Sequence, residues 1–400
     1  MFIEILVAMI LGIFVGVITG LTPGIHINLV SLLVLSASPF LSYYFTLVSL
    51  ACFIISMSVT HSFLDSIPSI YFGAPDSDQV LGVLPGHRYL LAGHGYIALK
   101  LTVIGSFGAL LLSILLFPFF MLIVEYGYDY ISGYIGYLLL LVVVFMTLRN
   151  NKKLWALLVF LLSGVLGLIV LNIPGFENPL FPMLSGLFGI STLIYSINSN
   201  ESLPVQKINH ELKLSKKLVL KALFSGQFSG FLTAVLPGVG AAIAAILSLQ
   251  ITRNLGDKGF LILSGSINTV NFILSMVTLY ILNKARNGAV IVVQMLVEGI
   301  TLSNVLVFLS VTLVAGSVSV FLALRIAKIF SRIISLVNYR LLVVGIIFFI
   351  IVLVIFLSGL LGLLVLFVST AVGLIPAVVK VSRTQAMGCI MLPVMIYFIM

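Results

Sequence analysis

A Pro-Gly step interrupts two apolar stretches of this chain, and the two stretches match each other. The first step is Pro23-Gly24 and the second is Pro237-Gly238. Before each step, glycines recur at every fourth position and share one helix face, where a second backbone can approach closely. They are Gly12, Gly16 and Gly20 in the first stretch and Gly226 and Gly230 in the second. Proline then ends a helix, because it lacks an N–H group and clashes with the preceding turn. The pattern predicts two helices that pack closely on a neighbour and stop at Pro-Gly.

The apolar segments around these breaks have the length and composition of membrane spans. Hydrophobic residues make up 61% of the chain and charged residues 8%, whereas a soluble domain has about 25% charged residues. A spanning helix needs about 20 apolar residues, and the clearest apolar runs cover 131–148, 154–171, 300–324, 341–358 and 360–379. The sequence therefore predicts an all-α, polytopic protein of the cell membrane. Glu4 stands where a signal peptide has a basic flank, so we expect the first helix to be retained.

The charged and sulfur-containing residues argue against several other classes of protein. The net charge of +9 comes from basic residues in short loops, which is typical of the cytoplasmic side of a membrane protein. The two cysteines, Cys52 and Cys389, lie in apolar runs and form no metal-ligand spacing. Motifs of zinc hydrolases, serine hydrolases and phosphate-binding loops are absent from the sequence. We therefore expect no enzymatic activity, no nucleic-acid partner, no metal and no cofactor.

A polar linker over 198–217 divides the chain into two halves, 1–197 and 218–400, which follow one plan. The first half is predicted to hold a broken helix over 3–38, a polar stretch over 65–95, and helices over 43–64, 97–124, 131–148, 154–171 and 180–197. The second half is predicted to hold a broken helix over 217–251, a break at 283–288, a long run over 289–323, and helices over 259–282, 341–358, 360–379 and 384–400. Each Pro-Gly break is either the tip of a re-entrant hairpin or the junction of a full span with a half helix.

Loop charges favour opposite orientations of the two halves. Four basic groups are assigned to the cytoplasmic side; they are Arg149 with Lys152 and Lys153, the linker lysines, Arg325 with Lys328, Arg332 and Arg340, and Lys380 with Arg383. The acidic loops at Glu125 and Glu177 then lie outside. With the N-terminus also outside, we expect two pseudo-symmetric halves related as inverted repeats, the plan of many secondary transporters.

Three motifs occur in order along the chain and carry a family resemblance. They are Gly20-Leu21-Thr22-Pro23-Gly24, the segment 62–68 with 85–95 (Ser-Phe-Leu-Asp-Ser-Ile-Pro, then Pro-Gly-His-Arg-Tyr), and Leu236-Pro237-Gly238-Val239-Gly240. Together they resemble the large permease subunit of tripartite tricarboxylate transporters, the TctA family. The resemblance implies a carboxylate transporter that works with a small membrane subunit and a solute-binding protein. Because His26 and Asn28 replace small residues and 264–271 lacks a carboxylate, we expect a compact, divergent relative.

The two breaks form the predicted substrate site. A helix broken inside a membrane leaves polar backbone groups that are tolerated only within protein or beside a water-filled cavity. The N-terminus of the arm that follows Pro-Gly also attracts anions. The predicted substrate-binding residues are Thr19, Thr22, Pro23, Gly24, His26, Asn28, Thr233, Pro237, Gly238, Gly240, Asn268 and Asn271. The structural alternatives are packing kinks at the breaks, helix-backbone bonds of the threonines and interhelical bonds of the asparagines.

Two acidic residues in apolar surroundings, Asp65 and Glu298, are candidates for binding a coupling proton or sodium ion. His61 precedes Asp65 by one helical turn and can pair with it on one face. The alternatives are that Asp65 caps the following loop and that Glu298 is a solvated residue at the membrane interface. Arg88 is expected to contact either an anionic substrate or a lipid headgroup.

These features together predict a secondary active transporter of a small organic anion, for which a carboxylate is the expected class. Alternating access would expose the site between the two breaks to each side of the membrane in turn. Two alternatives stay open: a carrier of a lipid phosphate such as a polyprenyl phosphate, and a non-transporting scaffold or enzyme. The expected partners are the organic anion, the lipid bilayer, the two accessory subunits and further copies of the chain.

Overall fold

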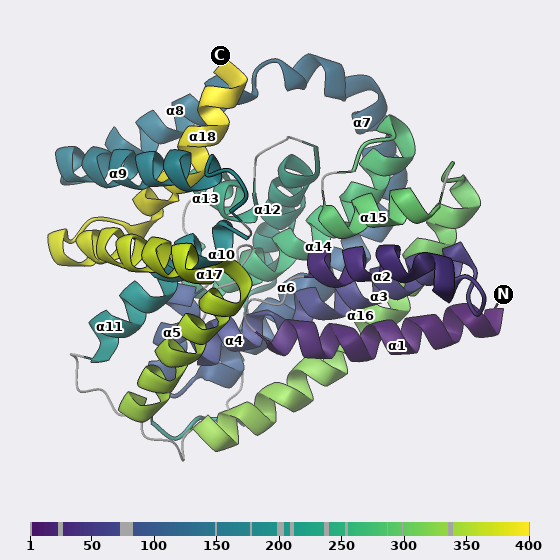
Figure 1. Ribbon diagram of the computed structural model, residues 1–400, viewed down its shortest axis with the longest axis horizontal. Helices are drawn as coiled ribbons and strands as arrows, with labels where there is room; N and C mark the ends of the chain where they lie inside the picture. Colours follow the sequence, from purple (N-terminus) through teal and green to yellow (C-terminus); the bar gives the residue numbers. More distant parts are fainter. Residues whose placement is uncertain are drawn as a thin grey trace.

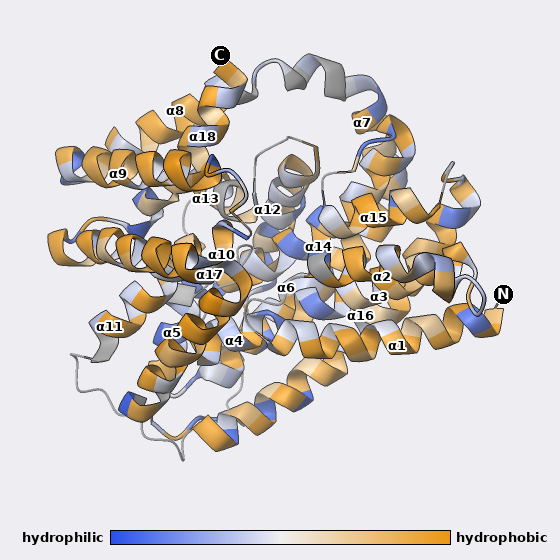
Figure 2. Cartoon of the chain, in the orientation of Figure 1, coloured by the Kyte–Doolittle hydropathy of each residue, from blue (hydrophilic) through white to orange (hydrophobic). Residues whose placement is uncertain are grey.

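The computed structural model describes residues 2–22, 27–72, 83–148, 150–176, 178–197, 204–208, 212–235, 240–252, 255–285, 287–297, 299–334 and 339–399. Every regular element within these ranges is a helix, and they contain no strand (Figure 1). Among the described helices, 8 are long and apolar enough to cross a membrane. Figure 2 shows apolar residues along most of each long helix and hydrophilic residues at several helix ends. The predicted all-α polytopic class is confirmed.

The first half forms more helices than its sequence predicts. They are α1 (Phe2–Leu21), α2 (Ile27–Leu41), α3 (Leu47–Leu64), α4 (Ser66–Tyr71), α5 (Val83–Leu91), α6 (Gly95–Leu115), α7 (Phe117–Ser132), α8 (Ile135–Leu148), α9 (Lys153–Leu171), α10 (Leu180–Leu184), the π-helix η1 (Ser185–Ile190) and α11 (Ser191–Ile197). The stretch over 65–95, for which no helix was predicted, contains α4 and α5 in its described parts. The helix predicted over 97–124 is two helices that meet at Leu116, since Pro118 in the first turn of α7 cannot continue the bonding of α6.

The second half contains α12 (Lys216–Val235), α13 (Ala241–Ile251), α14 (Gly256–Leu282), α15 (Gly288–Leu296), α16 (Leu302–Ile334), α17 (Tyr339–Val379), the short helix η2 (Arg383–Met387) and α18 (Gly388–Ile399). The break predicted at 283–288 is confirmed, because Asn283 adopts a left-handed conformation with φ of 50°. The prediction of one run over 289–323 is wrong, since α15 and α16 are separate helices and Gly299 between them has a φ of +66°. Gly359, with a φ of 65°, interrupts α17 between the two helices predicted there.

The glycine faces of α1 and α12 make equivalent contacts. Gly12 of α1 lies so close to α3 that a Cβ atom at this position would overlap the side chain of Ser56. Gly226 of α12 lies as closely against Ser266 of α14. The next glycine along each helix lies one turn further along the same partner: Gly16 lies against Thr60, and Gly230 lies against Val270. Both pairs of helices therefore run parallel. The predicted close packing of the two glycine faces is confirmed.

Both broken segments are helical hairpins. Ser229 Oγ of α12 donates to Ala244 O at 3.2 Å, and Ser248 Oγ of α13 donates to Ser225 O at 3.2 Å. These contacts pair the later part of α12 with the earlier part of α13, so the two arms are antiparallel. In the first half, α1 and α3 begin at the same end of the molecule, where Thr46 N donates to Glu4 Oε2 at 3.3 Å. The intervening α2 therefore returns toward the start of α1. Both hairpin tips lie outside the described residues.

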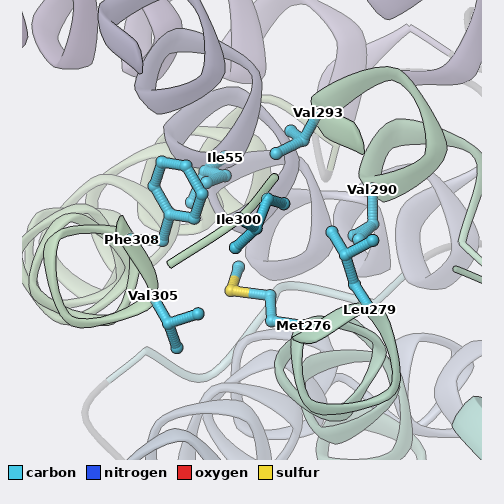
Figure 3. Close-up of a pocket in the computed structure, with 8 residues that line it drawn as sticks. All are labelled: Ile55, Met276, Leu279, Val290, Val293, Ile300, Val305 and Phe308. Carbon is cyan, nitrogen blue, oxygen red and sulfur yellow. The ribbon is translucent and has the colours of Figure 1, made fainter. Parts of the chain in front are cut away.

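The parallel partners of the hairpins, α3 and α14, form the centre of the molecule. They run antiparallel to each other: Ile55, in the middle of α3, lines a small pocket with Met276, late in α14 (Figure 3), whereas the end of α3 contacts Asn268, in the middle of α14. The pocket is completed by Leu279, Val290, Val293, Ile300, Val305 and Phe308 and has a free volume of about 10 Å³. Because its lining is apolar and this volume is at the lower limit for a water molecule, the pocket is dry packing space and offers no polar contact to an anion.

Two further helices cover this centre, and a second group of helices packs beside it. α16 lies on α3, where Ser319 Oγ donates to Thr60 Oγ1 at 3.0 Å, and α6 lies on α14, where Ser106 Oγ donates to Gly265 O at 3.0 Å. The second group pairs α8 and α9 with α18, and α10, η1 and α11 with α17. α7 leaves the central helices and arches toward α8 (Figure 1). Each group thus contains helices from both halves of the sequence.

Candidate functional site

A group of buried polar side chains lies where the end of α3 crosses the middle of α14. Asp65, at the junction of α3 and α4, is 4% exposed, and Asn268 of α14 is 6% exposed. Asn268 Nδ2 donates to Asp65 Oδ2 at 3.3 Å, and Ser66 Oγ donates to Asp65 Oδ1 at 3.3 Å. The Asp65 side chain makes no capping bond to α4. The carboxylate instead links the first half of the chain to the second.

His61, one helical turn before Asp65, contacts a neighbouring helix. His61 Nδ1 lies 3.1 Å from Thr19 Oγ1 in the last turns of α1. Thr19 Oγ1 also lies 3.3 Å from Gly16 O, and in the matching position Thr233 Oγ1 donates to Gly230 O at 2.8 Å. Both threonines therefore make the helix-backbone bond that was the structural alternative for them. Each of them also stands in the last turns before a hairpin tip.

Two amide oxygens on one face of α14 have no hydrogen-bond partner among the described residues. They are Asn268 Oδ1 and Asn271 Oδ1, and both atoms are buried. Asn271 also borders the second hairpin, since a Cβ atom on Gly230 would stand 3.1 Å from its backbone nitrogen. An acceptor buried without a donor costs roughly 1–3 kcal/mol. The face of α14 between α3 and the α12–α13 hairpin thus presents unsatisfied oxygens.

The other predicted site residues fall into two sets. Thr22 ends the first arm, with its backbone nitrogen bonded to Ile18 O at 3.1 Å. Asn28 lies in the first turn of α2 against Gly288 of α15, and Gly240 is the exposed residue that precedes α13. Both second arms thus begin next to a tip. The remaining predicted residues lie outside the described part of the chain; these are Pro23, Gly24, His26, Pro237, Gly238 and Glu298.

The basic segment before α6 lies at the surface and is engaged with protein. Arg88 Nη2 contacts Asp257 Oδ1 at 3.1 Å, and the Arg88 side chain is 66% exposed. The neighbouring His87 is buried, and its Nδ1 lies 3.3 Å from Ile70 O. Burial lowers the pKa of His87 below its usual 6.5, and the contact with Ile70 opposes this shift. The described contacts of Arg88 therefore show an ion pair with a carboxylate.

The sequence profile of the tripartite tricarboxylate transporter TctA family matches residues 6–388. This chain belongs to the TctA family. An uncharacterized protein of Methanocaldococcus jannaschii is 30% identical to it, over 98% of this chain and 99% of that protein. No solved structure matches the chain. Membership confirms the resemblance read from the Pro-Gly motifs and makes the chain a component of a membrane transporter family.

Sequence reasoning missed one buried polar group of this TctA-family protein. Gln227 Nε2 of α12 donates to Ala109 O at 2.9 Å, and Ser113 Oγ of α6 donates to Gln227 Oε1 at 3.0 Å. An amide directly after Gly226 in an apolar helix was the available signal. Because both ends of the Gln227 amide are satisfied, this group holds α12 to α6. Within the described residues, no three His, Cys, Asp or Glu side chains gather as a transition-metal site requires.

Proposed function

We propose that this protein is the large permease subunit of a secondary active transporter for a small organic anion, with a carboxylate as the expected class. Family membership supports the transporter class and a tripartite complex. In this proposal the chain works in the cell membrane with a small membrane subunit and a solute-binding protein. A proton or sodium gradient supplies the driving force.

The observation that carries the proposal is the pair of hairpins packed in the same way on two central helices. α1 and α2 lie against α3, and α12 and α13 lie against α14. Broken helices in corresponding places of two halves indicate the binding site of a transporter. The antiparallel course of α3 and α14 supports the inverted-repeat relation of the halves, because each hairpin follows the direction of its own partner.

The proposed anion site lies at the two tips. α2 and α13 begin directly after them, and the first N–H groups of a helix attract negative charge. Nothing lies within 4 Å of a Cβ atom placed on Gly240, so the backbone at the start of α13 is accessible. Thr19 and Thr233 stand one helical turn or less from the ends of α1 and α12. Movement of the central helices against the group around α17 and α18 would expose this site to each side in turn.

Uptake into liposomes tests the proposal. We expect labelled di- or tricarboxylate to enter under an imposed proton or sodium gradient, with the accessory subunits added where the chain alone is inactive. Gly24→Leu and Gly238→Leu should abolish uptake. Gly345→Leu is the matched control, because Gly345 is an exposed helical glycine with open space around it.

The alternatives give different results in the same liposomes. Transfer of a labelled polyprenyl phosphate without any carboxylate uptake would replace the anion proposal by the lipid-phosphate alternative. Full activity of folded Pro237→Ala and Gly238→Leu variants would favour a scaffold or enzyme. The described contacts give the lipid alternative no added support, since Arg88, its expected phosphate ligand, pairs with Asp257.

A further inference from the structure

The crossing of α3 and α14 has the wrong chemistry for an anion. Its charged group is the Asp65 carboxylate, and the donor of Asn268 already serves that carboxylate at 3.3 Å. What the crossing offers beyond this pair are acceptors, namely Asn268 Oδ1 and Asn271 Oδ1. A carboxylate substrate placed here would face like charge and unpaired lone pairs. This chemistry differs from that of the helix N-termini proposed to bind the anion.

The same chemistry suits a small hard cation. Carboxylate and amide oxygens are the ligands that hard cations prefer. One carboxylate with neutral amide oxygens balances a single positive charge, and the contacts described at this crossing involve one acid, Asp65. Asn268 and Asn271 are three positions apart on α14, so their side chains are neighbours on one face. A bound cation would satisfy both amide oxygens at once.

We propose that Asp65, Asn268 and Asn271 bind a sodium ion at the crossing of α3 and α14. This deepens the proposed function, because the ion would be the coupling ion of the transporter. Asp65 comes from the first half of the chain and both asparagines come from the second. A bound ion would therefore join the two halves of the chain through the central helices α3 and α14.

Direct binding of sodium tests the site without any substrate. Purified protein in detergent is titrated with ²²Na⁺ at constant ionic strength, with choline as the replacement cation, and its melting temperature is recorded in parallel. We expect saturable sodium binding and a melting temperature that rises with sodium concentration, because a ligand bound only by the folded state stabilises it. Asp65→Asn and Asn268→Ala should weaken binding roughly tenfold or more. Asp257→Asn is the control, because Asp257 is a surface carboxylate paired with Arg88 and should leave binding unchanged.

Asn271→Ala keeps the test decisive if the two more buried variants do not fold, as judged by gel filtration. It should weaken binding in the same direction. Absence of saturable sodium binding by the wild-type protein, or undiminished binding by folded Asp65→Asn, would overturn the proposal. Stabilisation that follows pH and not sodium, and that Asp65→Asn removes, would also overturn it and make the site a proton site. Sodium binding without carboxylate uptake would contradict the transport proposal and leave the sodium site standing. Failure of the sodium site and failure of the transport proposal are therefore distinguishable.

Discussion

At the scale of single residues, Asn271 and Gln227 are two membrane-buried amides with opposite expected effects on stability. Asn271 Oδ1 has no donor among the described residues, whereas both ends of the Gln227 amide are bonded. In sodium-free buffer, Asn271→Leu should raise the melting temperature by the equivalent of about 1 kcal/mol, because it removes an unsatisfied acceptor. Gln227→Leu should lower it, since it leaves Ser113 and Ala109 without their partner. Thermal unfolding in detergent measures both. Equal losses in the two variants would contradict the assignment.

His87 should make stability depend on pH. Burial lowers its folded-state pKa below the ordinary value of 6.5, so the unfolded chain binds the proton more readily. The contribution of neutral His87 is therefore present above pH 6.5 and is lost as the pH falls below that value. The melting temperature of the wild type should fall as the pH is lowered from about 7.5 to about 5.5. His87→Gln should flatten this slope, and an unchanged slope in a folded variant would rule His87 out as its source.

Sequence reasoning placed several polar residues of the candidate site correctly in the core but did not find the contact between Asp65 and Asn268. Helical spacing relates only near neighbours on one helix face, such as His61 and Asp65. The observed partner of Asp65 is Asn268, 203 residues away. The packing of α3 on α14 brings these two residues together, and a single sequence does not predict contacts between residues so far apart in the chain.

At the scale of helices, the contact of α6 with α14 depends on two glycines. Gly105 lies against the backbone oxygen of Ile262, and Gly265 lies against that of Thr102. Gly105→Ala should destabilise the protein by about 1–3 kcal/mol, because the added Cβ overlaps backbone that cannot rotate away. Gly345→Ala, in open space on α17, is the control. A thermal shift as small as that of the control would show that the two helices can separate at little cost.

The hairpin formed by α12 and α13 can be tested by a disulfide. In a chain whose Cys52 and Cys389 are replaced by alanine, Ser229→Cys combined with Ala244→Cys should oxidise to an intramolecular bond. The reason is that Ser229 Oγ reaches Ala244 O at 3.2 Å, which places the two residues side by side. Peptide mapping without reductant detects the bond, and Ser229→Cys alone is the control. Recovery of both thiols in reduced form after oxidation would contradict the hairpin.

Periodicity and apolar length predicted most of the long helices, but not their interruptions. The boundary between α15 and α16 falls in a run of mainly apolar residues, where Gly299 has a positive φ. Likewise, length could not separate a hairpin from a span with a half helix. Contacts between α12 and α13 show that the second segment reverses its direction, and both first arms, α1 and α12, are long enough to span a membrane. The matching glycine faces indicated only that each first arm has a close neighbour.

At the scale of the whole molecule, the predicted orientation awaits its own test. The basic linker is expected inside and the region of Glu125 outside. A cysteine placed at the exposed Tyr126 should react with a membrane-impermeant maleimide in intact cells, whereas one at Lys213 should react only after permeabilisation. The background is the chain without Cys52 and Cys389. The reverse pattern would invert the assigned topology.

The apolar pocket beside the central helices also bears on the escape of ions from the polar crossing. Ile55 in its lining precedes Asp65 by ten residues on α3, or about 15 Å at the rise of a helix. An ion that left the polar crossing by this route would have to shed its hydration against eight apolar side chains, including Phe308. In the proposed transporter, this apolar barrier would oppose leakage of the coupling ion through the protein when no substrate is bound.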